Sequence, residues 1–353
     1  MKDEAPRLLD GDAPAVARVT AVVITYNGRE LLERMLPTLL SQRYGNFEAL
    51  VVDDGSVDGT VEHLRQRWPQ VRVIANPVNL GVAASLNRGV QAAHGEYVAL
   101  LNNDIELDPG WLAALVRSLE EHPEAAASTG KLLDFHRREL FEAAGDFMRW
   151  SGMSGHYGQG ERVGVACEDP VAVFSPCAGA ALYRRSAFAD VGLFDEDFFA
   201  YLEDVDWGFR ARLAGYTARY EPAAVAYHMG GATTGREANR FTALLRRNSA
   251  FVVVKDYPAT ALLRHLPKVA AFQLISLYAS YRDGILTAHL RELASSIRLL
   301  PRMLRKRRGI QRSRRVSVAQ LDAMMAPEVY AAATIGERLR LLGRALAPLF
   351  RRQ

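Results

Sequence analysis

The first 125 residues alternate between short apolar runs and segments with helical spacing, and this alternation constrains the fold more than any other feature. Four runs are expected as buried strands, at 19–27, 47–56, 71–76 and 96–104. Four segments are expected as helices, at 29–42, 60–69, 81–95 and 109–123. Strict β–α alternation favours an α/β fold with a doubly wound, mostly parallel sheet.

Acidic and amide side chains follow two of these expected strands. Asp53 and Asp54 end the second run, and Asn102, Asn103 and Asp104 end the fourth. The carboxyl ends of parallel strands meet at the edge where such sheets bind ligands. We therefore expect Asp53 or Asp54 to accept a hydrogen bond from a nucleobase or ribose. The alternative is that the pair shapes a turn, the role we favour for neighbouring Asp58.

Later in the chain, the segment LEDVDWGFR supplies further acidic side chains and the isolated His228 an imidazole. We expect them at the same edge of the sheet. Asp204 is the candidate general base, beside Glu203, because a base must reach an acceptor hydroxyl. Asp206 and Arg210 are spaced for a helical ion pair. Acids at a helix start can also be dipole partners only.

Asp104 is the best candidate for a metal ligand, because Mg²⁺ and Mn²⁺ prefer oxygen donors. Asn102 offers only a neutral oxygen. His228 can complete the ligand set, although a lone histidine is more often structural. The other seven histidines, His156 among them, are given no role.

The segment NLGVAASLNRG over 79–89 has small residues where a helix begins. Small residues let backbone approach a diphosphate, and a helix N-terminus favours an anion. Close helix–sheet packing explains the same composition equally well. Asn79 and Gly81 are the residues that would contact the anion. We expect Asp108 to cap the helix that follows it.

The net charge of +4 divides unequally along the chain. Residues 241–353 carry 21 Lys and Arg against 6 Asp and Glu, a net charge of +15, so residues 1–240 carry −11. An acidic half suits a metal site. A basic tail suits an anionic surface, such as phospholipid, lipid-linked phosphate or nucleic acid.

We expect a flexible leader over 1–17, a catalytic domain over 18–240 and a basic helical region over 241–353. The polar N-terminus does not resemble a signal peptide. Two cysteines without metal-type spacing make a reducing, cytosolic compartment the simplest interpretation. The longest uncharged apolar run, 269–281, is too short to cross a bilayer, so we expect a buried or interfacial helix.

The second half of the expected catalytic domain is less regular. Residues 131–175 are expected as loops over the site, 178–185 as a strand, 203–215 as a helix, and 217–222 and 223–228 as two short strands. In the basic region, one apolar stripe recurs at helical spacing. Its members are Leu286, Leu290, Leu293, Ile297, Leu300 and Leu304, ahead of a dense basic run over 304–315.

Taken together, these motifs resemble the family 2 glycosyltransferases over roughly residues 18–235, and most closely the bacterial rhamnosyltransferase-type branch that builds cell-surface glycans. The motifs that carry the resemblance occur in the order VVITYN, VVDDGSVDGT, NLGVAASLNRG, YVALLNNDIELDP and FFAYLEDVDWGFRARLAGY, before the histidine. The resemblance implies a GT-A fold, Mn²⁺ or Mg²⁺, a UDP- or dTDP-sugar donor, and inversion at the anomeric carbon.

The resemblance also implies roles for particular residues. Tyr26 and Asn27 would lie by the nucleoside, with Asp53 or Asp54 holding the base. Residues 102–104 stand at the family's D-x-D position, where Asn102 replaces the first aspartate and removes one negative charge. Asp104 and His228 would bind the metal.

The acceptor would be a glycan or lipid-linked saccharide, and the tail, from RRN at 246–248 onward, would attach peripherally to the cytoplasmic face of the inner membrane. Two alternatives remain at this point: a sugar-1-phosphate nucleotidyltransferase, and a non-catalytic binder of glycan or nucleic acid. The first would want a glycine-rich basic loop that the N-terminus lacks. Nucleic acid is disfavoured because few aromatics interleave the arginines. The donor sugar, the acceptor and the oligomeric state stay open.

Overall fold

The computed structural model describes residues 17–230 and 238–328. The expected leader therefore lies almost wholly outside the described residues, as does the end of the basic region.

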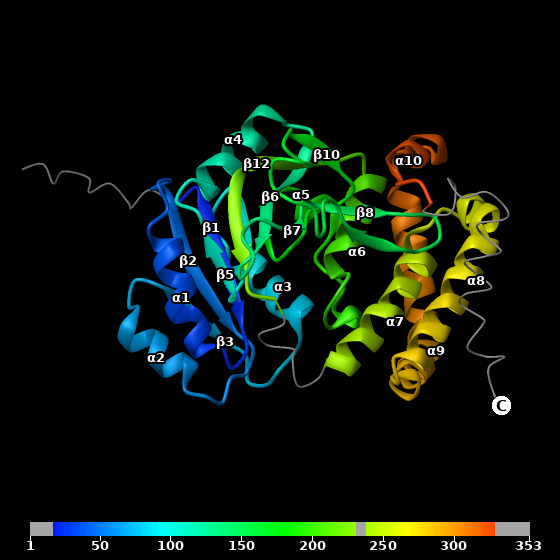
Figure 1. Ribbon diagram of the computed structural model, residues 1–353, viewed down its shortest axis with the longest axis horizontal. Helices are drawn as coiled ribbons and strands as arrows, with labels where there is room; N and C mark the ends of the chain where they lie inside the picture. Colours follow the sequence, from blue (N-terminus) through cyan, green and yellow to red (C-terminus); the bar gives the residue numbers. More distant parts are fainter. Residues whose placement is uncertain (1–16, 231–237, 329–353) are drawn as a thin grey trace, which may run out of the picture.

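A mixed sheet of ten strands forms the centre of the molecule (Figure 1). Along its main path the strands lie in the order β10-β12-β6-β11-β4-β1-β2-β3, with β5 beside β12 and β7 beside β6. The pairs β1–β2, β1–β4, β2–β3 and β6–β12 are parallel. The strand bounds are β1 Val19–Thr25, β2 Phe47–Asp53, β3 Arg72–Ala75, β4 Tyr97–Asn102, β5 Ile105–Leu107, β6 Ala125–Asp134, β7 Phe141–Ala143, β10 Val171–Val173, β11 Ala180–Arg184 and β12 Thr217–His228. A separate hairpin pairs β8 (Asp146–Met148) with β9 (Ser154–His156).

Helices cover both faces of this sheet, as the expected α/β alternation requires. The helix bounds are α1 Arg29–Leu40, α2 Thr60–Arg67, α3 Val82–Ala92, α4 Trp111–Glu121, α5 Ala187–Val191, α6 Glu203–Leu213, α7 Ala238–Asp256, α8 Ala259–Arg282, α9 Leu286–Ser313 and α10 Val318–Met324. A 3₁₀ turn, η1, spans Glu196–Phe198.

Successive side chains of β1 point to opposite layers, as the period of a strand demands. Val19 and Val23 pack in a core with α1 and α4, whereas Val22 and Ile24 pack in a second core with α3 and α6. Gly89 of α3 lies so near the sheet that a Cβ there would be 2.2 Å from Val22 Cγ1. Helix–sheet packing therefore accounts for part of the small-residue composition of this helix.

Strand order reverses at β1, which places a crevice at the carboxyl ends of β1 and β4. The chain adds β2 and β3 on one side of β1 and then returns to add β4 on the other. Loops leaving neighbouring strands at such a switch point diverge and leave room for a ligand. Thr25 and Asn102, which end the two strands, both line the resulting cavity.

Two segments differ from the sequence-based expectations. The strand β6 was not predicted, because its Ala-, Ser- and Gly-rich first half has low strand propensity. The two short strands expected over 217–228 are one strand, β12, whose register shifts between Glu221 and Val225. Pro222 lies at that shift, where its missing N–H removes a ladder bond. Residues 131–175 contain short strands as well as loops.

The C-terminal helices α7–α9 lie side by side at one end of the sheet (Figure 1). They share a core with α6 and the β8–β9 hairpin, in which Phe209 and Phe251 are fully or almost fully buried. Among the described helices, none is both long and apolar enough to span a bilayer.

Part of the basic region pairs with acids of the α/β part. Lys306 contacts Asp195 and lies 2.6 Å from Asp197, and Arg315 lies 3.2 Å from Asp190. The opposite net charges of the two halves therefore form ion pairs within the protein, whether or not an external partner also binds them.

Candidate functional site

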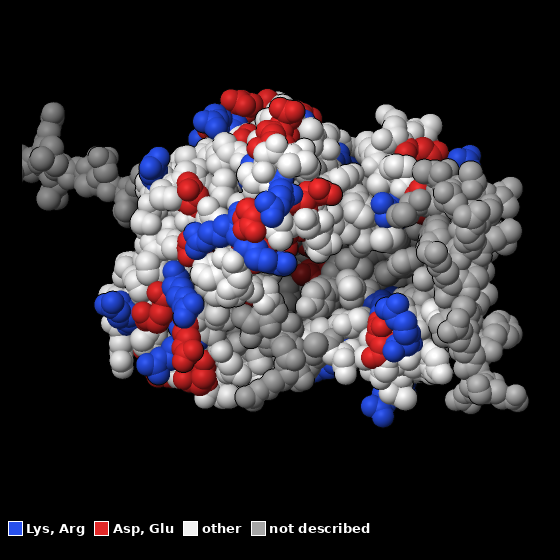
Figure 2. Space-filling model, in the orientation of Figure 1, with Lys and Arg blue, Asp and Glu red and all other residues white. Residues whose placement is uncertain are grey.

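A cavity of about 560 Å³ opens at the carboxyl ends of β1 and β4. Figure 2 shows acidic side chains inside a hollow near the middle of the face. Most residues predicted from the sequence line this cavity: Tyr26, Asp54, Asn79, Gly81, Asn102, Asn103, Asp104, Glu203, Asp204 and His228. Asn27, which is exposed, and Asp53, which is buried, do not line it. The fold thus brings together side chains that are more than 200 residues apart in sequence.

Asp104 and His228 are adjacent, because β5 and β12 pair directly beside them. His228 pairs with Ile105 in the strand register, and the backbone N–H of Met229 donates to the carbonyl of Asp104 at 3.0 Å. The side chains then meet with His228 Nε2 3.2 Å from Asp104 Oδ1. A carboxylate oxygen and an imidazole nitrogen that line one cavity can bind a divalent metal, and the oxygen is the donor type that Mn²⁺ prefers.

Glu142 holds the other side of the same imidazole. Its Oε1 lies 2.5 Å from His228 Nδ1 and comes from β7, which reaches β12 through β6. Burial acts to lower the pKa of His228, but hydrogen bonds to Asp104 and Glu142 outweigh it and raise the pKa to about 10. The Nδ1–Glu142 bond fixes the ring with Nε2 toward Asp104, and a metal bound between these two side chains would have to replace the Nε2 proton.

Asp204 and Glu203 lie at the first turn of α6 and line the cavity. Asp204 Oδ2 accepts a hydrogen bond from the Ala178 N–H at 3.0 Å. Burial, followed by the nearby charge of Asp146, raises the pKa of Asp204 to about 6. Burial raises the pKa of Glu203 to about 8, with the charge of Asp204 adding to it. Both carboxyl groups are therefore harder to ionise than a free one, and the hydrogen bond from Ala178 favours the ionised form of Asp204, which makes it the better candidate for the base.

The two aspartates at the end of β2 have different surroundings. Asp54 lines the cavity, but its carboxylate accepts hydrogen bonds from the N–H groups of Leu80 and Gly81, both at 2.9 Å, and from the Asn76 amide. Asp53 accepts from the Ser56 N–H at 2.9 Å, and its buried Oδ2 has no partner in the described residues. Both therefore shape loops, and contact with a base remains a prediction for either.

Three other predicted residues lie in or beside the loops at this end of the sheet, where the resemblance implies the nucleoside. Asn27 ties two loops together, because its Oδ1 accepts from the Val57 N–H at 2.8 Å. Asn103 is buried and donates to Thr25 Oγ1 at 2.8 Å. Tyr26 is 37% exposed and lines the cavity, so its ring is available to a ligand.

The predicted ion pair and turn are confirmed. Arg210 lies 2.9 Å from Asp206, and Asp58 Oδ1 accepts from the Thr60 N–H at 3.1 Å. Asp108 bonds to the N–H of Gly110, and α4 begins one residue later, at Trp111. The cap position of α4 is therefore Gly110, not Asp108 as predicted.

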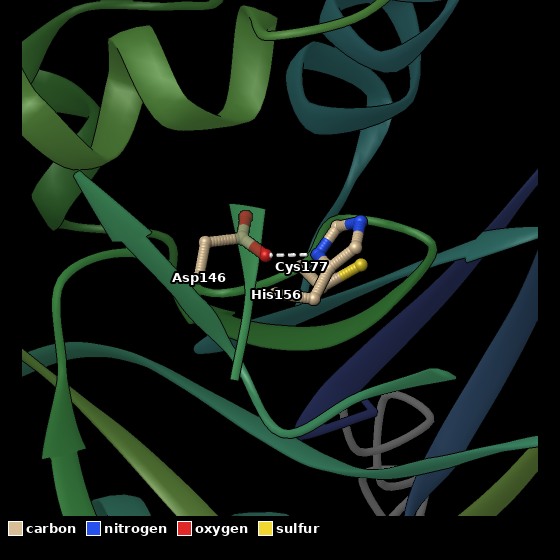
Figure 3. Close-up of side chains that lie close together, drawn as sticks. All are labelled: Asp146, His156 and Cys177. Atoms are coloured by element: carbon tan, nitrogen blue, oxygen red, sulfur yellow. Dashed lines mark hydrogen bonds and ion pairs between the residues drawn. The ribbon is translucent and has the colours of Figure 1, made fainter. Parts of the chain in front are cut away.

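A second cluster in the cavity was missed by sequence reasoning. Asp146 Oδ1 lies 2.6 Å from His156 Nδ1, and Cys177 lies beside them (Figure 3). Burial lowers the pKa of His156, but the hydrogen bond to Asp146 raises it to about 9. Burial raises the pKa of the Cys177 thiol well above its usual range, so the thiol stays protonated. The cluster thus presents an imidazolium near Asp204.

The described lining of the cavity is strongly acidic. Six acidic residues face it, against two histidines and no Lys or Arg: Asp54, Asp104, Glu142, Asp146, Glu203 and Asp204. A diphosphate would be repelled by such a lining unless a cation accompanied it. This charge balance, together with the oxygen and nitrogen donors of Asp104 and His228, fits a divalent metal.

The sequence matches the profile described as Glycosyl transferase family 2 over residues 20–192. A relative, the N-acetylglucosaminyl-diphospho-decaprenol L-rhamnosyltransferase of Mycobacterium tuberculosis, is 32% identical over 242 residues, which cover 61% of this chain and 77% of the relative. The chain belongs to glycosyl transferase family 2. Membership favours sugar transfer over the nucleotidyl transfer that the motifs alone left open.

Two solved structures share the fold. The mannosyltransferase PcManGT from Pyrobaculum calidifontis, in complex with GDP-Man and Mn²⁺, aligns with a TM-score of 0.51 and 21% identity, covering 87% of this chain and 86% of that chain. GalNAc-T7 with UDP, GalNAc and Mn²⁺ aligns with a TM-score of 0.53 and 15% identity, covering 69% of this chain and 48% of that chain. The expected GT-A fold is confirmed, with the helices α7–α10 following it.

Proposed function

We propose that this glycosyltransferase transfers a sugar from a nucleotide diphosphate donor to an acceptor hydroxyl, with inversion at the anomeric carbon. One observation supports this most: Asp104 and His228 lie 3.2 Å apart in the same acidic cavity that Asp204 lines. A metal-type donor pair and a candidate base thus share one space. Single displacement needs only these parts, because it requires no enzyme nucleophile.

Asp104 and His228 would hold Mn²⁺ or Mg²⁺, with Asn102 nearby as a neutral oxygen donor. When bound, such an ion stabilises the negative charge that develops on the departing diphosphate. The replacement of an expected aspartate by Asn102 leaves Asp104 as the one carboxylate of the tripeptide 102–104. Glu142 compensates in part by fixing the His228 ring.

Asp204 would accept the proton of the acceptor hydroxyl as its oxygen attacks. Its Oδ2 is anchored by the Ala178 N–H, which fixes the carboxylate relative to the cavity. Gly81, Asn79 and Tyr26 would line the donor side, where the N-terminus of α3 faces the cavity. The donor nucleotide would be UDP or dTDP, with its base near Asp53 or Asp54.

The rhamnosyltransferase relative favours rhamnose as the sugar and a lipid-linked saccharide as the acceptor, in cell-surface polysaccharide synthesis. His156 of the β8–β9 hairpin lines the cavity close enough for its charge to act on Asp204, so it would contact the acceptor.

We also propose peripheral attachment to an anionic membrane surface on the cytoplasmic face. Most of the predicted apolar stripe of α9 faces solvent: Leu290, Ile297, Leu300 and Leu304 are 41–72% exposed. Arg305, Arg308 and Arg312 are exposed on the same helix. Apolar side chains beside cations suit a bilayer interface.

A donor screen tests the proposed reaction. The purified chain is incubated with a panel of UDP-, dTDP- and GDP-sugars, with Mn²⁺ or with EDTA, and release of nucleoside diphosphate is measured. We expect slow hydrolysis of one donor that EDTA abolishes. Metal-independent release, or no release from any donor together with no Mn²⁺-dependent nucleotide binding, would contradict the proposal.

A further inference from the structure

The turn before the candidate base has an unfavourable backbone. Phe199, Tyr201 and Leu202 all have positive φ, at 64°, 67° and 63°, and none of them is glycine. Left-handed φ values are unfavourable for residues with a Cβ, so such a turn persists only where its surroundings hold it. Glu203 and Asp204 follow at once, as the first residues of α6.

The same turn touches the donor side of the cavity. The carbonyl of Phe199 accepts a hydrogen bond from the Ala83 N–H, at 3.3 Å, at the start of α3. A Cβ on Gly81 would lie 2.5 Å from the Phe199 ring and 2.7 Å from its carbonyl oxygen. Residues 198–202 therefore link the proposed diphosphate position to the proposed base.

The side chain of Asn248, from α7, lies beneath this turn. Its Nδ2 is 3.1 Å from the carbonyl oxygen of Phe198, 2.9 Å from that of Ala200 and 2.7 Å from that of Tyr201. Asn248 is fully buried, so water cannot take its place. Buried carbonyls need a donor, and this amide is shared among three of them.

Arg247 fixes Asn248 from behind. Its guanidinium donates to Asn248 Oδ1 at 2.8 and 2.9 Å, which orients the amide with its N–H groups toward the turn. It also donates to the carbonyls of Asp197 and Phe198, each at 3.0 Å. An ion pair with Glu292 of α9, at 3.0 Å, connects this arrangement to the next helix.

We propose that Asn248, oriented by Arg247, is a positioning residue that holds the 198–202 turn and thereby fixes Asp204 for catalysis. The C-terminal helices are then part of the catalytic apparatus as well as a membrane-facing region. This inference rests on the proposed function, because it takes Asp204 as the base.

The isosteric change Asn248→Asp tests the proposal in the full chain. It keeps the oxygen that accepts from Arg247 but removes the N–H donors to the three carbonyls. We expect kcat on the donor identified by the screen to fall about 10²-fold, the cost of misplacing a reacting group by about 1 Å. Binding of UDP or dTDP with Mn²⁺ should stay within about two-fold. Hydrogen exchange of the 198–206 backbone should become faster.

Ser249→Ala is the matched control, because Ser249 is a buried neighbour on α7 whose hydroxyl donates to Gly152, away from the turn. It should leave both kcat and the exchange of 198–206 unchanged. Asn248→Asp with near-normal kcat and slow exchange would overturn the proposal. If the wild-type chain lacks any transferase activity, the proposed function fails instead, and the exchange measurement alone decides whether Asn248 holds the turn.

Discussion

Asp204 faces the cavity with a raised pKa, which makes it the residue whose removal tests the proposed mechanism most sharply. Asp204→Asn keeps the size of the side chain but cannot accept a proton at neutral pH. We expect kcat to fall by about 10²–10⁴, while nucleotide binding with Mn²⁺ persists. Transfer kinetics and calorimetric titration of the nucleotide measure the two effects separately. Near-normal turnover would show that another group is the base.

The pH dependence of turnover follows from the same residue. A base must be deprotonated, so kcat should be low in acid and rise as the pH increases through about 6, the pKa that burial gives Asp204. A limb at the ordinary aspartate pKa, near 4, would contradict the buried setting.

Glu142 is expected to act through His228, since their side chains meet at 2.5 Å. Glu142→Gln should weaken Mn²⁺ binding about 10–100-fold, the usual effect of losing a carboxylate behind a metal-binding histidine. Calorimetric or EPR titration with Mn²⁺ and UDP measures this directly. Glu106→Gln is the control: Glu106 is near Asp104 in sequence but pairs with Arg138 instead. Equal losses in both variants would indicate a general effect of charge.

Among the candidate site residues, the sequence predicted those that follow strands and missed those that lie on hairpins. Asp104 and His228 could be placed because each ends an apolar run. Glu142, Asp146 and His156 lie on short strands within a region of no clear period. The sequence showed only that many polar residues lie between two predicted strands. That number does not indicate which of their side chains point into the cavity.

Helix α7 is joined to the α/β part by a buried ion pair. Lys255 is 1% exposed, lies 2.7 Å from Asp195 and also contacts Asp206. Burial acts to raise the pKa of Asp195, but the charges of Lys255 and Lys306 outweigh it and hold the pKa at about 2.

Lys255→Met would leave the two buried carboxylates without this partner, so we expect a loss of about 3–5 kcal/mol in the free energy of unfolding. Urea denaturation measures it. The control is Arg264→Met, which removes an exposed pair with Asp322 at 3.3 Å and should cost at most about 1 kcal/mol. Equal, small losses in both variants would mean that the buried pair does not join the two parts.

Strands and helices with a regular pattern of apolar residues were predicted well. Elements that mix small residues with apolar ones were not. The strands β1 to β4 are apolar runs bounded by turns, so their presence and parallel direction follow from alternation, whereas their order does not. The strand β6 begins with small residues whose pattern indicates neither strand nor helix, yet it is buried between β11 and β12. Tertiary packing decides its conformation.

Over the whole molecule, part of the basic charge is used for internal docking. The basic run of α9 was predicted as a membrane-binding segment, but Lys306 and Arg307 bond to the rest of the protein. The predicted apolar stripe is a better guide to the proposed membrane-binding face than the basic run, because Ile297 is 72% exposed and Leu290 is 49% exposed.

We expect the full chain to float with phosphatidylglycerol liposomes in low salt and to bind less in high salt. The double variant Leu290→Ser and Ile297→Ser should reduce partitioning at least about ten-fold, since burial of one such side chain contributes about 1.5 kcal/mol or more. Val57→Ser is the control, because Val57 is 87% exposed but lies on the α/β part. Unchanged flotation of the double variant would exclude this face of α9.

The central claim is that one cation position, between Asp104 and His228, lies within reach of the diphosphate and of Asp204. The most direct measurement is a crystal structure with UDP or dTDP and Mn²⁺, in which anomalous scattering locates the metal. We predict a peak bonded to Asp104, His228 and the diphosphate. A peak at Asp146, His156 and Cys177 instead, or a nucleotide bound in the cavity without any metal, would contradict the account.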